Sequence, residues 1–142
     1  MSEKLSANSA PLREIENMHE NEISGIIIDC SLKVHKALGP GLLESVYQAA
    51  LAYELRKHGL NVVTEQPIPV IYEDVKLEVG FRADLIVENK VIVEVKSIEA
   101  IAPVHSKILL TYLRLTEKKL GLLINFNVVL IKDGIKRVVD NL

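Results

Sequence analysis

Two stretches near the start of the chain repeat apolar residues at the spacing of an α-helix. Between residues 23 and 38 an apolar side chain recurs every three or four positions, and Gly-Pro-Gly at 39–41 ends the pattern. A second helix is predicted from about Leu42 to His58, with Gly59 as its C-terminal cap. Its predicted buried stripe consists of Leu43, Val46, Ala50 and Tyr53. The sequence therefore predicts two helices joined by a tight turn.

Beyond residue 59, apolar and polar residues alternate, which is typical of β-strands. Residues 61–74 include prolines at 67 and 69, so this segment is predicted to be an edge strand or an interrupted one. The next strand is expected to turn one face to the core and one away, with Leu77, Val79, Phe81, Ala83 and Leu85 opposite Glu78, Arg82 and Asp84. Residues 90–97 are predicted to form the following strand. One face carries Val91, Val93 and Val95, and the opposite face carries Ile92, Glu94 and Lys96. A loop at 88–90 is expected to join these two strands into a hairpin.

The remainder of the chain is predicted to form one helix and two more strands. Residues 104–118 have helical spacing, residues 121–131 form a buried strand, and a turn at 132–134 leads to an edge strand at 135–139. The order α-α-β-β-β-α-β-β predicts an α/β domain in which helices flank a central mixed sheet.

Length and composition indicate one domain. The 142 residues are 49% apolar, which is enough for one core and too little for two. We expect a polar, frayed or disordered leader over residues 1–22 and the domain over residues 23–142. The single cysteine excludes an intramolecular disulfide and a cysteine-based zinc site. Neither a signal segment nor a membrane span is visible, so we expect a cytoplasmic protein without a membrane partner.

Charge is distributed unevenly along the chain, although the net charge is only −2. Residues 1–22 hold five acidic and two basic side chains, whereas residues 107–142 hold seven basic and three acidic ones. The basic C-terminal third is suited to approach a phosphate backbone, but it lacks the dense basic stripe of a protein that binds nucleic acid by charge alone. Charge by itself fits ordinary solvated lysines better.

Two acids of the predicted hairpin differ from their apolar surroundings. If Asn89 is the midpoint of the loop, Asp84 and Glu94 face each other, because each lies five residues away. Opposed Cβ atoms are about 4.5–5.5 Å apart, and two like charges at that distance destabilise a sheet unless a cation lies between them. Lys96 shares the face of Glu94. Glu44, in the first turn of the second helix, offers a third carboxylate.

This arrangement favours a divalent metal site. Carboxylate oxygens suit Mg²⁺ and Mn²⁺, so we expect Glu44, Asp84 and Glu94 to hold one or two such ions. A bound ion acidifies a water molecule and stabilises charge on a phosphate. Lys96 would orient or deprotonate that water, or neutralise the developing negative charge.

A purely structural interpretation competes with the metal site. Surface hairpins often carry acids and lysines as ion pairs across the strands, and a salt bridge from Lys96 to Asp84 and Glu94 is the strongest such alternative. The apolar residues around the acids favour the metal site, because a fully solvated strand would be more polar.

Four further residues are candidates for contacts to substrate or to the site, namely Tyr47, Arg82, His105 and Tyr112. Tyr47 lies one turn after Glu44, where it either bonds a site carboxylate or packs. His105 lies at the start of the helix at 104–118, where it either contacts a phosphate or caps the helix.

Two segments, GPGLLESVY at 39–47 and FRADLIVENKVIVEVKS at 81–97, resemble the GxxExxY protein family, with Gly41, Glu44 and Tyr47 at the name-giving positions. The similarity runs from about residue 23 to the C-terminus. That family is assigned to the PD-(D/E)XK nuclease superfamily, which implies a restriction-endonuclease-like three-layer α/β fold with an αβββαβ core. It also implies that Asp84 is the catalytic aspartate, Glu94 and Lys96 the (D/E)-x-K pair, and Glu44 the helical acid.

The resemblance implies a Mg²⁺- or Mn²⁺-dependent nuclease that hydrolyses DNA or RNA, with a homodimer as one option. The alternative is a catalytically weak or inactive module that kept the fold and binds nucleic acid or a protein partner. One position departs from the family pattern. Relatives often carry glutamine four residues before the tyrosine of the following helix, whereas this chain has Ile108 before Tyr112.

Overall fold

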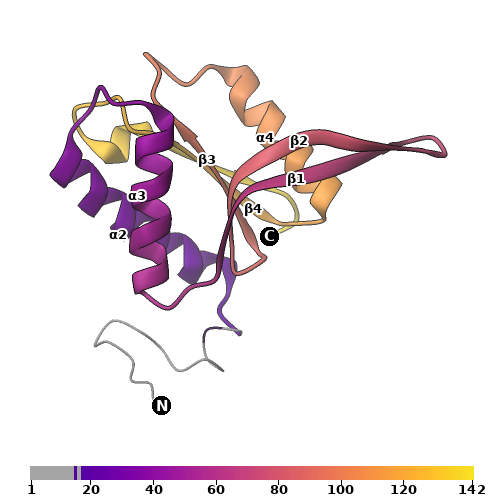
Figure 1. Ribbon diagram of the computed structural model, residues 1–142, viewed down its shortest axis with the longest axis horizontal. Helices are drawn as coiled ribbons and strands as arrows, with labels where there is room; N and C mark the ends of the chain where they lie inside the picture. The colour runs from indigo at the N-terminus through magenta and orange to yellow at the C-terminus, as the bar shows by residue number, and fades with distance from the viewer. Residues whose placement is uncertain (1–14, 16) are drawn as a thin grey trace.

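The computed structural model describes residue 15 and residues 17–142. Its elements are α2 (Glu20–Leu38), α3 (Glu44–Lys57), β1 (Val62–Tyr72), β2 (Val75–Val87), β3 (Val91–Lys96), α4 (Pro103–Thr116), β4 (Leu120–Asn125), the 3₁₀ helix η1 (Ile131–Gly134) and β5 (Ile135–Val139). Helices α2 and α3 cover one face of the sheet, α4 covers the other, and the hairpin of β1 and β2 projects beyond the body (Figure 1). None of the described helices has the length and apolar character needed to cross a membrane. The predicted order of elements is confirmed, and α3-β1-β2-β3-α4-β4 reproduces the αβββαβ core.

The five strands lie side by side in the order β1-β2-β3-β4-β5. Neighbouring strands are antiparallel except β3 and β4, which are parallel and are connected by α4. A parallel pair needs such a crossover. β1 is an edge strand, as its prolines predict, and β5 is the other edge. The strand that carries Glu94 and Lys96 is therefore the central one.

One apolar cluster on each face of the sheet holds the layers together. The larger one packs Ile27 of α2 and Leu51 of α3 against the valines of β3. The smaller one packs Leu109 of α4 against Ile92 of β3. Helix α4 approaches β4 so closely that a Cβ on Gly121 would lie 2.8 Å from the Leu109 side chain. This close approach requires a glycine and fixes α4 over the central strands.

The domain begins before residue 23. Helix α2 starts at Glu20, and His19 caps it by accepting a hydrogen bond from the Asn21 N–H at Nδ1 (2.9 Å). The Glu22 side chain completes this capping box at the His19 N–H (2.8 Å). Ile15 belongs to the larger apolar cluster. The predicted leader at 1–22 is therefore too long, because its last polar residues form a helix cap. Residues 1–14 and 16 lie outside the described residues.

The buried face of α3 is not the predicted one. Tyr47, Leu51 and Leu55 are fully buried, each one helical turn after the last. Leu43 and Tyr53 of the predicted stripe are 74% and 62% exposed. Both stripes have helical spacing, so periodicity alone does not choose between them.

Tyr47 closes the turn between α2 and α3. Its hydroxyl donates to the carbonyl of Gly39 (2.5 Å) and accepts from the N–H of Leu42 (3.1 Å). Gly39 and Gly41 have φ of +73° and +99°, a region that favours glycine. The ring of Tyr47 stacks on Phe126 with the ring centroids 4.5 Å apart. Of its two predicted roles, Tyr47 takes the packing role and fixes where α3 begins.

Replacing Tyr47 with Phe is expected to lower the free energy of unfolding by about 1–3 kcal/mol, because the N–H of Leu42 loses its partner. Urea denaturation measures this change. Tyr53→Phe, on the exposed face of the same helix, is the matched control and is expected to change stability by less than about 0.5 kcal/mol. Equal losses in the two variants would contradict the role given to the Tyr47 hydroxyl.

Strand β4 is shorter than predicted. Residues 121–131 were expected to be one buried strand, but β4 ends at Asn125 and Val129 is 88% exposed. The Asn125 side chain accepts a hydrogen bond from the N–H of Asn127 (3.1 Å). Such local bonds compete with strand pairing. The 3₁₀ helix η1 then takes the place of the predicted turn.

Candidate active site

The two predicted acids of the hairpin lie next to each other in the central sheet. β2 and β3 pair with Leu85 opposite Val93, which makes Asn89 the centre of the hairpin, as predicted. Leu85 and Val93 are the last residues that pair between these two strands, counting away from the turn. The next residues on the two strands are Asp84 and Glu94.

Each carboxylate accepts a hydrogen bond from the opposite strand. Asp84 Oδ2 accepts from the N–H of Val95 (2.8 Å), and Glu94 Oε2 accepts from the N–H of Asp84 (3.3 Å). The carboxylates thus take the place of backbone carbonyls where the strand pairing stops. The rigid backbone of two central strands therefore positions both acidic groups.

Burial disfavours the ionised form of both acids. Glu94 is 8% exposed, and burial followed by the charge of Asp84 raises the pKa of Glu94 to about 8. Burial also raises the pKa of Asp84, and the charges of Glu65 and Glu44 act in the same direction. The charge of Lys96 lowers both pKa values without offsetting burial. Two neighbouring acids that resist ionisation are suited to a cation, which would stabilise both charges.

The side-chain alternation of β2 breaks at Asp84. Phe81 and Ala83 pack in the smaller cluster beside α4, whereas Leu85 packs in the larger cluster. The prediction that these three residues share one face is therefore wrong. The interruption coincides with the residue of β1 at the same level, Glu65, whose φ is +53°. A left-handed residue within a strand pair disturbs the regular pleat.

Sequence reasoning missed Glu65. Its charge raises the pKa of both Asp84 and Glu94, so it lies near enough to act on the site. It stands two residues before the first proline of β1, which is a weak signal in the sequence. Only the pairing of β1 with β2 brings it to the level of Asp84.

Glu94 and Lys96 line a small pocket of about 90 Å³ beneath α4, which we call the site pocket. His105, Ile108 and Tyr112 of α4 form its other wall. In the part of the chain that the structure describes, no acid lies within 4.0 Å of the Lys96 amine, so the salt-bridge interpretation is not realised. The pocket has room for an ion with a few waters, since each water occupies about 30 Å³.

His105 caps α4 and also faces the site pocket. Its Nδ1 accepts a hydrogen bond from the N–H of Ala102 (2.9 Å). The neutral ring therefore carries its proton on Nε2 and has a donor to offer. The predicted capping role is present, and a phosphate contact stays a prediction. Ile108 lines the same pocket without contributing a polar group.

Tyr112 and Arg82 differ in their relation to the site. Tyr112 lines the site pocket and stacks on Phe81, with the ring centroids 3.6 Å apart. Burial, followed by the charges of Glu94 and Asp84, raises the pKa of Tyr112. Arg82 is exposed on β2 and is not among the residues that line the pocket.

Glu44 reaches toward the site from the first position of α3. Its Oε2 accepts a hydrogen bond from the N–H of Ser97 (3.2 Å), and the Ser97 hydroxyl donates to the carbonyl of Leu42 (2.7 Å). Among residue 15 and residues 17–142, no three Asp, Glu, His or Cys side chains are close enough to hold one ion. Glu44, Asp84 and Glu94 therefore do not form the predicted three-carboxylate metal cluster within the described residues. Asp84 and Glu94 are the pair whose donor atoms and burial fit a hard cation.

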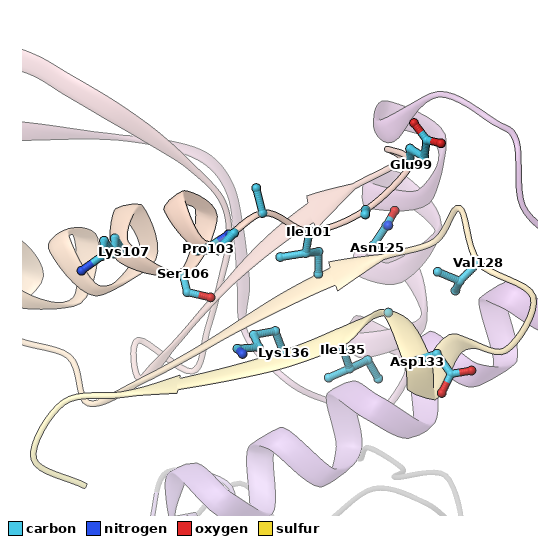
Figure 2. A pocket seen from close by; sticks show the side chains of 13 residues that line it. Glu99, Ile101, Pro103, Ser106, Lys107, Asn125, Val128, Asp133, Ile135 and Lys136 are labelled. Carbon is cyan, nitrogen blue, oxygen red and sulfur yellow. The ribbon is translucent and has the colours of Figure 1, made fainter.

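A larger cavity is separate from these residues. It has about 660 Å³ and lies between the loop after β3, the start of α4, and η1 with β5 (Figure 2). Lys107 and Lys136 lie toward one end of it, and Glu99 and Asp133 toward the other. None of the predicted catalytic or metal-binding residues lines it. Cavity size alone would therefore have pointed away from the acidic pair.

A family model described as the PD-(D/E)XK nuclease superfamily matches residues 21–138. No curated protein and no solved structure matches the chain. The matched range contains the whole sheet up to Val138, and it includes Glu44, Asp84, Glu94 and Lys96.

Proposed function

The chain belongs to the PD-(D/E)XK nuclease superfamily, and on that basis we propose that it hydrolyses phosphodiester bonds of DNA or RNA with the help of Mg²⁺ or Mn²⁺. Nucleases of this superfamily generally use divalent metal ions. The observation that carries the proposal is the pair of Asp84, which is partly buried, and Glu94, which is buried. Backbone N–H groups donate to both carboxylates and hold them side by side, and Lys96 lies on the strand of Glu94.

Each site residue has a distinct role in this proposal. Asp84 and Glu94 hold the ion, which when bound acidifies a water molecule and stabilises charge on the scissile phosphate. Lys96 donates to a phosphate oxygen, or accepts the proton of the attacking water when its amine is neutral. Glu44 orients a water beside the acidic pair, and His105 offers its Nε2 proton to the phosphate. These roles are consistent with the oxygen donors at the site and with a Lys96 amine that has no acidic partner among the described residues.

A calorimetric titration with Mn²⁺ tests the proposal. We expect the wild type to bind Mn²⁺ and Glu94→Ala to lose that binding, because half of the acidic pair is gone. Glu99→Ala, at an exposed acid on the loop after β3, is the matched control and should bind as the wild type does. Absence of Mn²⁺ binding to the folded wild type at millimolar concentration would refute the metal site.

Replacing Lys96 with Met is expected to lower the cleavage rate by about a hundredfold or more, the scale of a lost proton-transfer or electrostatic group. Mn²⁺ binding should persist, because Lys96 is no ligand. Single-turnover cleavage of plasmid DNA, single-stranded DNA and RNA gives the rate, and Lys107→Met is the control. Cleavage at the wild-type rate in Lys96→Met would remove this residue from the mechanism.

A second candidate is a module that binds nucleic acid without cleaving it. Two observations favour it, namely the apolar Ile108 in the site pocket and the absence of a third metal-ligating side chain among the described residues. It predicts that Lys96→Met leaves nucleic-acid binding intact while charge reversal in the basic C-terminal third, such as Lys136→Glu, weakens it. Cleavage that depends on Glu94 would exclude this candidate.

A further inference from the structure

A second cavity, of about 470 Å³, lies between the β1–β2 sheet and the C-terminal end of α4. Its walls are apolar and are formed by Val63, Ile68 and Ile86. The other lining residues are polar. Three are the carboxamides Asn61, Gln66 and Asn89, and the remaining two are Thr116 and Lys118. We call this cavity the amide pocket. None of its lining residues is acidic, so it is suited to a polar or anionic ligand.

Asn89 and Lys118 hold each other in place at the rim. The Lys118 amine donates to Asn89 Oδ1 (3.2 Å). Asn89 lies in the hairpin turn with φ of +56°, and Glu117, just before Lys118, has φ of +55°. Tight turns thus fix both backbones. Because the oxygen of Asn89 is engaged, its Nδ2 hydrogens remain as donors.

The other two carboxamides complement Asn89. The Gln66 Nε2 donates to the carbonyl of Pro67 (3.4 Å), which leaves Oε1 as an acceptor. The backbone of Asn61 exchanges hydrogen bonds with Glu88, whereas its side chain has no hydrogen-bond partner within the described ranges. The rim therefore presents donors and acceptors above an apolar wall.

This combination matches the chemistry of a nucleobase. Carboxamides pair with the donor and acceptor groups on base edges, and the flat face of a base packs on apolar side chains. Lys118 supplies a cation for a neighbouring phosphate, and burial lowers the pKa of Lys118, so an anion beside it would offset the loss of hydration.

The amide pocket and the site pocket lie one after the other along the same face of α4. Ile108 and Tyr112 line the site pocket, and Thr116 lines the amide pocket. These three residues are spaced four apart, which places them on one face of the helix at intervals of about 6 Å. A strand lying along this face would reach both pockets.

We propose that the amide pocket binds an unpaired nucleobase of the substrate strand, and that single-stranded nucleic acid is therefore the substrate class. The inference rests on the proposed function, since it assigns the substrate of the same site. In a duplex the edge of each base is engaged by its partner, so a base must be unpaired before the carboxamides can read it.

Fluorescence anisotropy with a labelled oligonucleotide in EDTA tests the pocket without cleavage. Asn89→Gly removes a carboxamide and keeps the left-handed backbone, and Gln66→Leu removes a second. Each variant is expected to bind the single strand about tenfold more weakly than the wild type, the scale of one or two lost hydrogen bonds. Lys119→Met, at the exposed neighbour of Lys118, is the control and should bind normally.

The outcomes separate this inference from the proposed function. If Asn89→Gly and Gln66→Leu lose affinity for the single strand and not for a duplex, the result supports base binding in the amide pocket, even if the wild type cleaves nothing. Wild-type affinity in both variants, or an equal loss on a duplex of the same sequence, overturns it, even if cleavage depends on Glu94. Unfolding temperatures of both variants near that of the wild type establish that the loss is local.

Discussion

Replacing Glu94 with Gln is expected to abolish metal-dependent cleavage and, at the same time, to stabilise the metal-free protein. Cleavage should fall by more than about a thousandfold, the scale on which an essential member of a catalytic unit acts. The amide keeps the size of the carboxylate but carries no charge for a cation. Stability should rise at pH 8 because burial and Asp84 both oppose the Glu94 charge.

Single-turnover cleavage and urea denaturation in EDTA measure the two effects. Opposite signs are informative, because a residue that serves only the fold would lower both stability and activity when replaced. Glu99→Gln is the matched control and should change neither. A Glu94→Gln protein that is less stable than the wild type in EDTA at pH 8 would show that the Glu94 charge is already compensated.

The stability of the metal-free protein is expected to fall as pH rises from about 4.5 to about 8. The pKa of Glu94 is raised from 4.5 to about 8 on folding, so the folded state binds more protons than the unfolded state in this window. The stabilisation is complete below pH 4.5 and is lost as the pH passes 8. At 1.36 kcal/mol per pKa unit, the free energy of unfolding should fall by on the order of 4 kcal/mol across this pH window.

Urea denaturation in EDTA at a series of pH values measures this dependence. The raised pKa of Asp84 adds to it in the same direction. Glu94→Gln should flatten the profile, and saturating Mn²⁺ should reverse the slope in the wild type, since an ion binds the ionised acids. A wild-type profile in EDTA that matches that of Glu94→Gln would contradict the raised pKa.

Much of the hairpin that carries the site could be predicted because its signals are local. A three-residue loop centred on Asn89 fixes the register over the few residues on either side, and that register sets Asp84 and Glu94 at the same level. Glu44 was likewise placed at the start of its helix by the glycines before it. Both inferences depend on neighbours within about ten residues.

Other features depended on contacts between distant segments. The buried side of α3 follows from Tyr47, whose ring meets Phe126 far along the chain. Glu65 comes near the acidic pair only through strand pairing across the sheet. Periodicity in the sequence indicates that a helix has an apolar stripe. The element that packs against the helix decides which side is buried.

The sequence by itself determined the order of helices and strands, the hairpin register and the identity of the acidic pair, because short-range periodicity and turn chemistry specify them. Only the tertiary structure decided that Glu44, Asp84 and Glu94 form no three-residue metal cluster among the described residues, that Lys96 has no acidic partner there, and that residues on one face of α4 line both pockets. Those outcomes depend on how closely separate layers pack, which is set by side-chain volumes across the sheet rather than by spacing along the chain.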